Sequence, residues 1–169
     1  MKKTLLIIVL GALMCSCSTD SVKLSGRLLG LGSRVVYLEK VTGGEKKLID
    51  SVSLASNGDY SFDINGVGAT PTLYNVVYNG ERIPLLLTGG ERVTVNTVGA
   101  ALRNYTVEGS KESELLREFN RFYVEGMVNM ASILEKYSGN NFSEDDKRTL
   151  MQEYTHEYRL VKREQLRFI

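Results

Sequence analysis

Cysteine has the most reactive side chain in this sequence, and the chain has two such residues, Cys15 and Cys17. Both follow a lysine pair and an almost unbroken apolar run from Leu5 to Met14. A positive start followed by a short apolar run is typical of a secretion signal, because a helix that spans a bilayer needs roughly 20 apolar residues. The sequence therefore predicts that residues 1–16 are a signal peptide that is removed on export.

The end of the apolar run resembles the lipobox of bacterial lipoproteins, in which a small residue precedes the cysteine that is acylated and becomes the new N-terminus. Ser16 fits that position before Cys17. The bulky Met14 fits poorly before Cys15. Cys17 is therefore the predicted lipidation site, and 17–21 is a short tether. Acyl chains hold a protein at a membrane because each buried methylene contributes about 0.8 kcal/mol. We expect a membrane-anchored lipoprotein of the cell envelope, in the outer membrane and facing the periplasm.

Chemistry beyond the signal is limited by what the sequence lacks. No cysteine follows Cys17, which excludes disulfides, thiolate metal sites and cysteine nucleophiles there. His156 is the only histidine, so neither a histidine metal cluster nor a Ser-His-Asp triad can form, and we interpret it as a solvated helix residue. The acidic run 144–146 suits the first turn of a helix, and Gly30 and Gly32 suit a turn. We predict no metal, no cofactor and no enzyme; a carboxylate pair assembled by folding is the remaining route to catalysis.

Size and charge restrict the class of protein further. With 169 residues and 43% hydrophobic content, the chain can bury one core and a small extension. The formal net charge is +1, and it includes Lys2 and Lys3, which leave with the signal. The remainder is close to neutral. Because nucleic acid is bound through a basic face, no nucleic-acid partner is expected.

Tyrosine is abundant, with nine copies and no tryptophan. Tyr74 and Tyr78 point to the same side of one expected strand, where they could form a stacking platform for sugars. Strands also favour tyrosine simply for packing. A glycan-binding module on these two rings is therefore kept as an alternative.

Apolar residues alternate with polar ones from Val22 to Glu108, with turn residues at short intervals. This pattern predicts an antiparallel β-sandwich or barrel for residues 22–108. Asn57-Gly58 is interpreted as the turn of a hairpin, and Pro84 predicts an edge strand because proline cannot donate to a ladder. About eight strands are expected, at 22–28, 34–41, 46–54, 60–64, 72–78, 82–87, 92–96 and 103–108.

The period changes to that of an amphipathic helix after Gly109, so residues 109–169 are expected to form a helical arm. Two helices are predicted, at 111–137 and 143–169, with Ser110 capping the first and a Ser143–Asp146 capping box opening the second. If Ile169 is the C-terminus, their apolar faces must bury against the sandwich or a second copy. The sequence alone leaves two alternatives open for these faces: packing on the sandwich, or a docking face for a protein partner.

Six segments of residues 22–122 resemble, in order and spacing, the β-rich N-terminal domain of unknown function, of the DUF4369 type, that precedes a thioredoxin-like domain in many Bacteroidota envelope lipoproteins. The segments are Leu24-Ser25-Gly26-Arg27-Leu28, Val36-Tyr37-Leu38, Ile49-Asp50-Ser51-Val52, Gly58-Asp59-Tyr60-Ser61-Phe62, Leu85-Leu86-Leu87-Thr88-Gly89-Gly90-Glu91-Arg92-Val93-Thr94-Val95 and Val107-Glu108-Gly109-Ser110-Lys111-Glu112-Ser113-Glu114-Leu115-Leu116. The helices after Gly109 resemble the linker helices of that family.

The resemblance implies a module that positions a thioredoxin-like domain, but no position matches that domain's Cys-x-x-Cys pair. Either this is a shortened paralogue or a fragment of a thiol-disulfide oxidoreductase. The leading hypothesis is a non-catalytic envelope lipoprotein module with a placement or partner-binding role. Ser21 and Ser51 lie in Asp-Ser-Val triplets that resemble the short O-glycosylation sequon of such bacteria.

Overall fold

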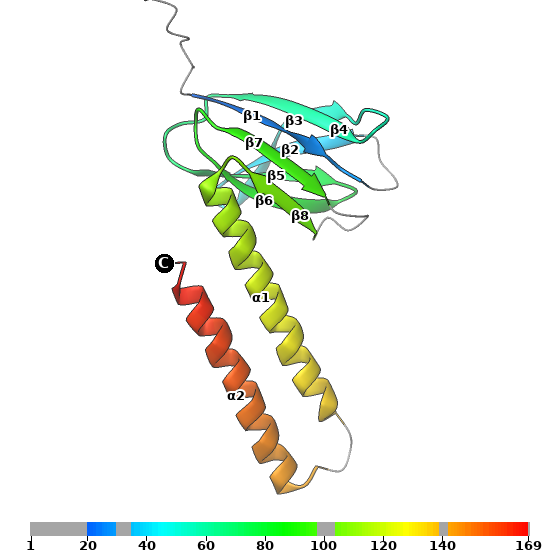
Figure 1. Ribbon diagram of the computed structural model, residues 1–169, viewed down its shortest axis with the longest axis vertical. Helices are drawn as coiled ribbons and strands as arrows, with labels where there is room; N and C mark the ends of the chain where they lie inside the picture. The colour runs from blue at the N-terminus through cyan, green and yellow to red at the C-terminus, as the bar shows by residue number, and fades with distance from the viewer. Residues whose placement is uncertain (1–19, 30–34, 98–103, 139–141, 169) are drawn as a thin grey trace, which may run out of the picture.

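The computed structural model describes residues 20–29, 35–97, 104–138 and 142–168, which form eight strands and two helices (Figure 1). Cys17, the glycine turn at 30–32 and the break at 139–141 lie outside the described residues. The predicted fold class, mainly β with two C-terminal helices, is confirmed. The elements are β1 (Ser21–Arg27), β2 (Val35–Thr42), β3 (Glu45–Ser53), β4 (Asp59–Asn65), β5 (Thr72–Tyr78), β6 (Glu81–Leu87), β7 (Arg92–Thr97), β8 (Tyr105–Glu108), α1 (Lys111–Lys136) and α2 (Glu144–Leu166).

The strands form two four-stranded sheets that enclose one core between them. One sheet has the order β4-β1-β7-β8, and the other has the order β3-β2-β5-β6. Neighbouring strands are antiparallel except for β1 and β7, which run parallel. The first strand of the chain therefore lies inside its sheet, with β4 on one side and β7 on the other.

The alternation of residue types places one face of each strand between the sheets. In β4, Tyr60, Phe62 and Ile64 are buried while the residues between them are exposed. Complete burial of an aliphatic or aromatic side chain contributes about 1.5–3 kcal/mol, so this core supplies most of the stability of the sandwich. Its largest fully buried members are Tyr74, Phe62, Leu24, Leu28, Leu38, Ile83, Leu85, Leu87, Val22, Val36, Val67 and Val76.

The turn at Asn57-Gly58 joins β3 to β4, but these strands belong to different sheets, so the hairpin predicted there is wrong. A two-residue type I′ hairpin needs positive φ at both central residues, and here only Gly58 has it, with φ 86°. The Asn57 side chain instead accepts a hydrogen bond from the Asp59 N–H at 3.2 Å. Two-residue hairpins with positive φ at both central residues lie instead at Gly43-Gly44, between β2 and β3, with φ 59° and 85°, and at Asn79-Gly80, between β5 and β6, with φ 52° and 78°.

Pro84 lies in β6, which is an edge strand, as its missing N–H predicts. The register places Asn75 of β5 opposite Pro84, so the proline has a strand neighbour on one side only. β8 is the corresponding edge of the other sheet. Both edges contact α1, which covers this side of the sandwich.

The start of α1 is fixed to the sandwich by two serines. Ser110 is the N-cap, as predicted, and its side chain accepts a hydrogen bond from the Ser113 N–H. The hydroxyls of Ser110 and Ser113 also donate to the Leu86 carbonyl of β6, at 3.0 and 2.7 Å. Both serines are buried and Leu86 is half-buried, so these bonds join the helix to the edge strand with little exposure to water.

The helices form an antiparallel hairpin that extends away from the sandwich (Figure 1). Their facing sides pack on each other, and α1 also contacts β6 and β8. Several apolar side chains of both helices stay exposed, so their burial against a second copy stays a prediction. The close approach is possible because Gly126 of α1 lies directly against Val161 of α2. The predicted Ser143–Asp146 capping box is confirmed at the start of α2. Neither helix of the described part is apolar enough along its length to cross a membrane.

Candidate functional site

Tyr74 and Tyr78, the predicted sugar platform, both point into the core between the sheets. Tyr74 is 2% exposed and Tyr78 is 3% exposed. A sugar stacks on a ring face that water can reach, and these rings present none in this structure. The only cation near the Tyr74 ring among the described residues is the Lys40 ammonium, 5.7 Å from its centroid. Burial thus assigns the pair to packing and removes the basis of the glycan-binding alternative.

The other residues singled out from the sequence lie apart from one another. Ser51 is exposed on β3 and Ser21 is half-buried at the start of β1, so their O-glycosylation stays a prediction. His156 is exposed on α2, as expected. Residues 144–146 form the acidic first turn of α2, where the Ser143 side chain and backbone hold the pKa of Asp146 below its usual range. Within the described residues no cluster of three or more His, Cys, Asp or Glu could hold a metal ion.

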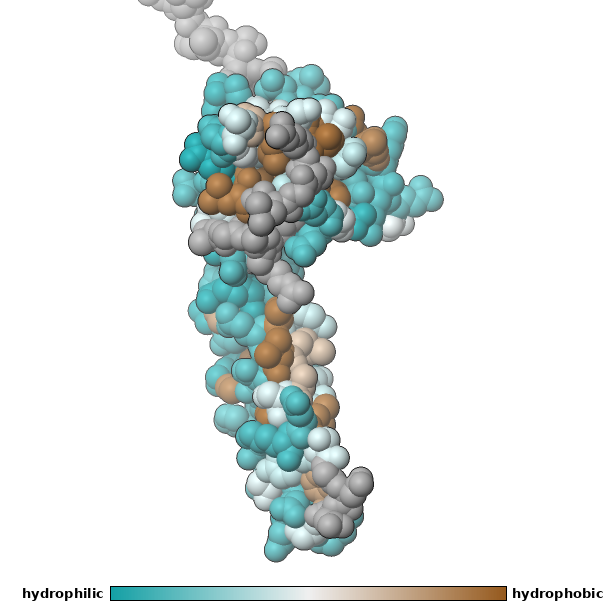
Figure 2. All heavy atoms as spheres, turned by 90° about the vertical axis from the view of Figure 1, so that its right-hand side faces the viewer, coloured by the Kyte–Doolittle hydropathy of each residue, from teal (hydrophilic) through white to brown (hydrophobic). Residues whose placement is uncertain are grey.

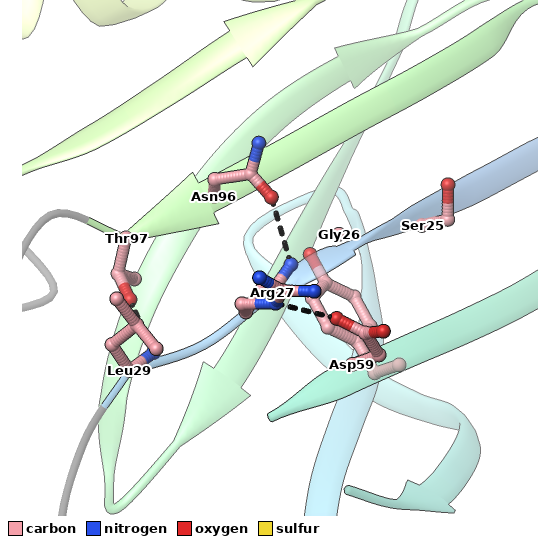
Figure 3. A pocket seen from close by; sticks show the side chains of 8 residues that line it. Ser25, Gly26, Arg27, Leu29, Asp59, Asn96 and Thr97 are labelled. Atoms are coloured by element: carbon pink, nitrogen blue, oxygen red, sulfur yellow. Dashed lines mark hydrogen bonds and ion pairs between the residues drawn. The ribbon is translucent and has the colours of Figure 1, made fainter. Parts of the chain in front are cut away.

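A shallow polar cleft lies at one end of the sheet that contains β1 and β7 (Figure 3). Arg27 donates from its Nε to Asp59 at 2.7 Å, and its backbone N–H donates to the Asn96 side chain at 2.8 Å. The Leu29 N–H donates to the Thr97 hydroxyl at 2.7 Å. The Arg27 guanidinium also lowers the pKa of Asp59. These side chains use their polar atoms to hold the end of β1 against its neighbours, which is a structural role.

A deeper groove of about 530 Å³ lies between the first half of α1 and the edge strands β6 and β8. Arg117, Asn120 and Arg121 line it from one face of α1, because residues three and four apart share a face of a helix. Pro84 of β6 and Val124 of α1 supply apolar lining. The groove therefore combines cationic and amide donors with an apolar wall.

Arg117 is fixed in the groove by Tyr105 of β8. Its Nε donates a hydrogen bond to the Tyr105 carbonyl, and its guanidinium lies 5.8 Å from the centroid of the Tyr105 ring. Tyr105 is 7% exposed, and its hydroxyl has no hydrogen-bond partner among the described residues. Burial raises the pKa of that hydroxyl, while the nearby Arg117 cation and Asn120 amide oppose the rise.

The helical arm carries exposed apolar side chains beside the contact between its helices. On α1, Tyr123, Met127 and Leu134 follow one stripe, and on α2 Met151 and Tyr158 are seven residues apart. Met151 is 63% exposed and Leu134 is 50% exposed. Figure 2 shows apolar residues gathered along part of the arm among hydrophilic ones. Isolated exposed apolar residues are common on protein surfaces, whereas these are repeated along two paired helices.

An apolar hollow of about 720 Å³ lies where the arm meets the sandwich. Leu86 of β6, Leu115 and Phe119 of α1, and Phe168 after α2 line it. The Phe119 and Phe168 rings meet edge to face, with centroids 5.6 Å apart. The end of α2 is thereby held near the base of α1.

The geometry defines a class of protein: a two-sheet β module that presents a helical arm. The family model of a domain of unknown function (DUF4369) matches residues 22–116, which cover the sandwich and the start of α1. The chain belongs to this family, and the resemblance stated from the sequence is confirmed to that extent. The function of that family is unknown.

A solved structure of a putative cell adhesion protein from Bacteroides ovatus is similar to this chain at 16% sequence identity, with a TM-score of 0.31. The match covers 54% of this chain and 43% of that one, so this chain matches less than half the length of that protein. No match was found among the curated proteins.

The groove is a site that the sequence did not indicate, whereas the sequence already singled out the apolar faces of the two helices as a docking face. Arg117, Asn120 and Arg121 have the i, i+3, i+4 spacing of one helix face, which was available as a signal. Their neighbours from β6 and β8 are remote in sequence, and only folding brings them to that face.

Proposed function

We propose that this chain is a non-catalytic binding module of the cell envelope, anchored through lipid at Cys17, whose helical arm contacts a protein partner. The sandwich is the rigid base and the arm is the contact surface. The observation that carries the proposal is the repeated exposed apolar side chains of α1 and α2, among them Met127, Leu134 and Met151. Burying such side chains against a partner releases about 25 cal/mol per Å² of apolar area.

The arm is suited to this role by the way it is held. The Ser110 and Ser113 hydroxyls fix the start of α1 to β6, and the Phe119–Phe168 contact holds the end of α2 near the same place. A contact surface on a fixed element loses little conformational entropy on binding. In the lipoproteins that the sequence resembles, a thioredoxin-like domain follows this module, so a polypeptide of that kind is the first partner to test.

The test of the contact surface uses two neighbouring positions on α2. Met151→Glu places a charge on the apolar stripe, whereas Gln152→Glu places the same charge on the next residue, which is also exposed. Chemical crosslinking in native membranes, followed by identification of the crosslinked polypeptide, should give a defined adduct with the native protein and with Gln152→Glu. The adduct should be lost with Met151→Glu. Equal crosslinking of both variants, or no adduct with the native protein, would contradict the proposal.

The same two variants also test whether the arm binds a second copy of this chain. Light scattering of the purified protein distinguishes a second copy from a different partner, because only a homo-oligomer forms in the absence of other proteins. A dimer that Met151→Glu dissociates and Gln152→Glu leaves intact would replace the partner with a second copy of this chain.

The envelope anchor is tested by intact mass and fractionation. The native protein should begin at an acylated Cys17 and sediment with outer membranes, whereas Cys17→Ser should be recovered without the lipid. A native protein that retains residues 1–16, or that carries no acyl chain, would overturn the anchor and leave the contact surface on the arm unaffected.

A further inference from the structure

The groove between α1 and the edge strands offers hydrogen-bond donors that the fold leaves unused. The Nε of Arg117 is bonded to the Tyr105 carbonyl, but its two terminal nitrogens have no hydrogen-bond partner in the described part of the chain. Arg121 has only the exposed Glu125 carboxylate, 3.7 Å away, and an exposed pair at that distance contributes little. Arginine forks match the two oxygens of a carboxylate or the oxygens of a phosphate.

The buried Tyr105 hydroxyl is the second, independent sign of an occupant. A buried polar group without a partner destabilises a protein, so such groups in native structures are usually satisfied by something that binds there. The Arg117 guanidinium near this hydroxyl can only donate, and the Asn120 amide lowers the pKa of the hydroxyl, which is the effect of a donor; both residues line the groove. A hydroxyl among donors needs an acceptor, so the missing partner is an acceptor oxygen.

The residues that form the wall of the groove indicate the chemistry of the rest of the ligand. Pro84 and Val124 line it with apolar surface. Arg82, the third arginine of the groove, is already held by Glu39 through two hydrogen bonds, at 3.0 and 3.2 Å. The exposed Glu81 and Glu125 also line the groove and oppose a large negative charge. The free donors thus fit one small anionic group, with room beside it for an apolar one.

We propose that this groove binds the carboxylate of a small organic acid that carries an apolar side group, such as an acylated apolar amino acid. The carboxylate lies between Arg117 and Arg121 and accepts a hydrogen bond from the Tyr105 hydroxyl. The apolar group packs on Pro84 and Val124. This site is separate from the exposed stripe of the arm and does not depend on the partner proposed for it.

The test is a titration of the purified protein with N-acetyl-L-leucine, followed by NMR of the backbone amides. N-acetyl-L-leucinamide is the neutral control for the ligand, and inorganic phosphate is the control for an anion without an apolar group. Saturable shifts are expected in β8 and the first half of α1 with the acid alone. Shifts that never saturate, that both leucine compounds cause equally, or that phosphate causes with equal affinity would each overturn the proposal.

Two variants with opposite expected effects on the affinity for the acid separate ligand binding from a structural effect. Arg121→Gln should weaken binding of the acid about tenfold, and Glu125→Gln should strengthen it because it removes the competing carboxylate. Tyr105→Phe keeps the ring and removes only the hydroxyl, so it should weaken binding while the fold stays intact. Arg159→Gln, on the exposed surface of α2, is the matched charge control and should bind as the native protein does. Equal affinity in Arg121→Gln and Arg159→Gln would refute the assignment.

Discussion

Replacing Gly126 by alanine measures how closely the two helices of the arm approach each other. Gly126 is buried in α1, and a Cβ there would lie 2.1 Å from Cγ2 of Val161 on α2. In an unhindered helix interior, glycine to alanine stabilises by about 1 kcal/mol. Here the new methyl must displace a β-branched side chain with few rotamers, and overpacking of this kind costs about 1–3 kcal/mol. We therefore expect Gly126→Ala to destabilise the arm by about 1 kcal/mol.

A double-mutant cycle with Val161→Ala isolates this contact. Once the valine methyls are removed, Gly126→Ala should stabilise the arm by about 1 kcal/mol, its intrinsic helix propensity. The change of sign between the two backgrounds corresponds to a coupling energy of about 2 kcal/mol. Urea unfolding followed by helical circular dichroism measures it, because the helical signal reports on the arm.

The control for propensity is Ala131→Gly, at an exposed position of the same helix. It should cost about 1 kcal/mol in either background. If Gly126→Ala stabilises the protein with Val161 in place by the full propensity difference, the helices do not approach as closely as the structure shows. The reasoning about the arm would then be refuted.

Three further perturbations test the sandwich and its attachment to the arm. Ser113→Ala removes a buried hydrogen bond to a β6 carbonyl and should cost about 1 kcal/mol in urea unfolding. Gly109→Ala should destabilise by more than about 1 kcal/mol in thermal unfolding, because φ is +88° and a Cβ would lie 2.1 Å from the Arg92 carbonyl oxygen. Arg82 lowers the pKa of Glu39, so that pair should stabilise the folded state above the ordinary value of 4.5 and lose this contribution as the pH falls below it. Urea unfolding across that range should show a smaller acid-dependent loss for Glu39→Gln than for the native protein.

The sequence predicts the elements well because their signals are local. The alternation in β4, the missing N–H of Pro84 and the side chain of Ser110 each act within a few residues of their position. Eight strands, an edge at β6 and the cap of α1 follow directly from them. The interpretation of Asn57-Gly58 fails because the turn residues were read without their partner strand, and here the partner belongs to the other sheet.

Local sequence patterns do not show which distant segments of the chain pair with each other. The parallel contact of β1 with β7 joins Leu24 to Val93, and nothing within either strand specifies the other. The same holds for the helices, whose contact depends on Gly126 lying against Val161. An isolated glycine in a helical pattern indicates lower helix propensity, and its packing role is visible only once the second helix is in place.

For the candidate sites too, the sequence shows which residues share a face but not which residues folding brings together. Burial of Tyr74 and Tyr78 could not be distinguished from exposure, because alternation shows that two residues share a face and not which face is covered. The groove residues Arg117 and Arg121 share a helix face in the sequence. Their partner Tyr105 comes from β8, so the buried hydroxyl becomes a feature of the site only through packing.

The interior position of β1 also determines the order in which the protein can fold. β1 precedes the other described strands in the chain, but its parallel neighbour β7 follows only after five further strands. Long-range pairing of this kind is slow, because the loop entropy is lost before the contacts form. Until β7 arrives, the apolar side chains of Val22 and Leu24 lack part of their core. β4, the other neighbour of β1, lies closer in the chain, so one edge of β1 can pair early while the other stays open until β7 is in place. The two helices follow each other directly in the chain and can pair locally.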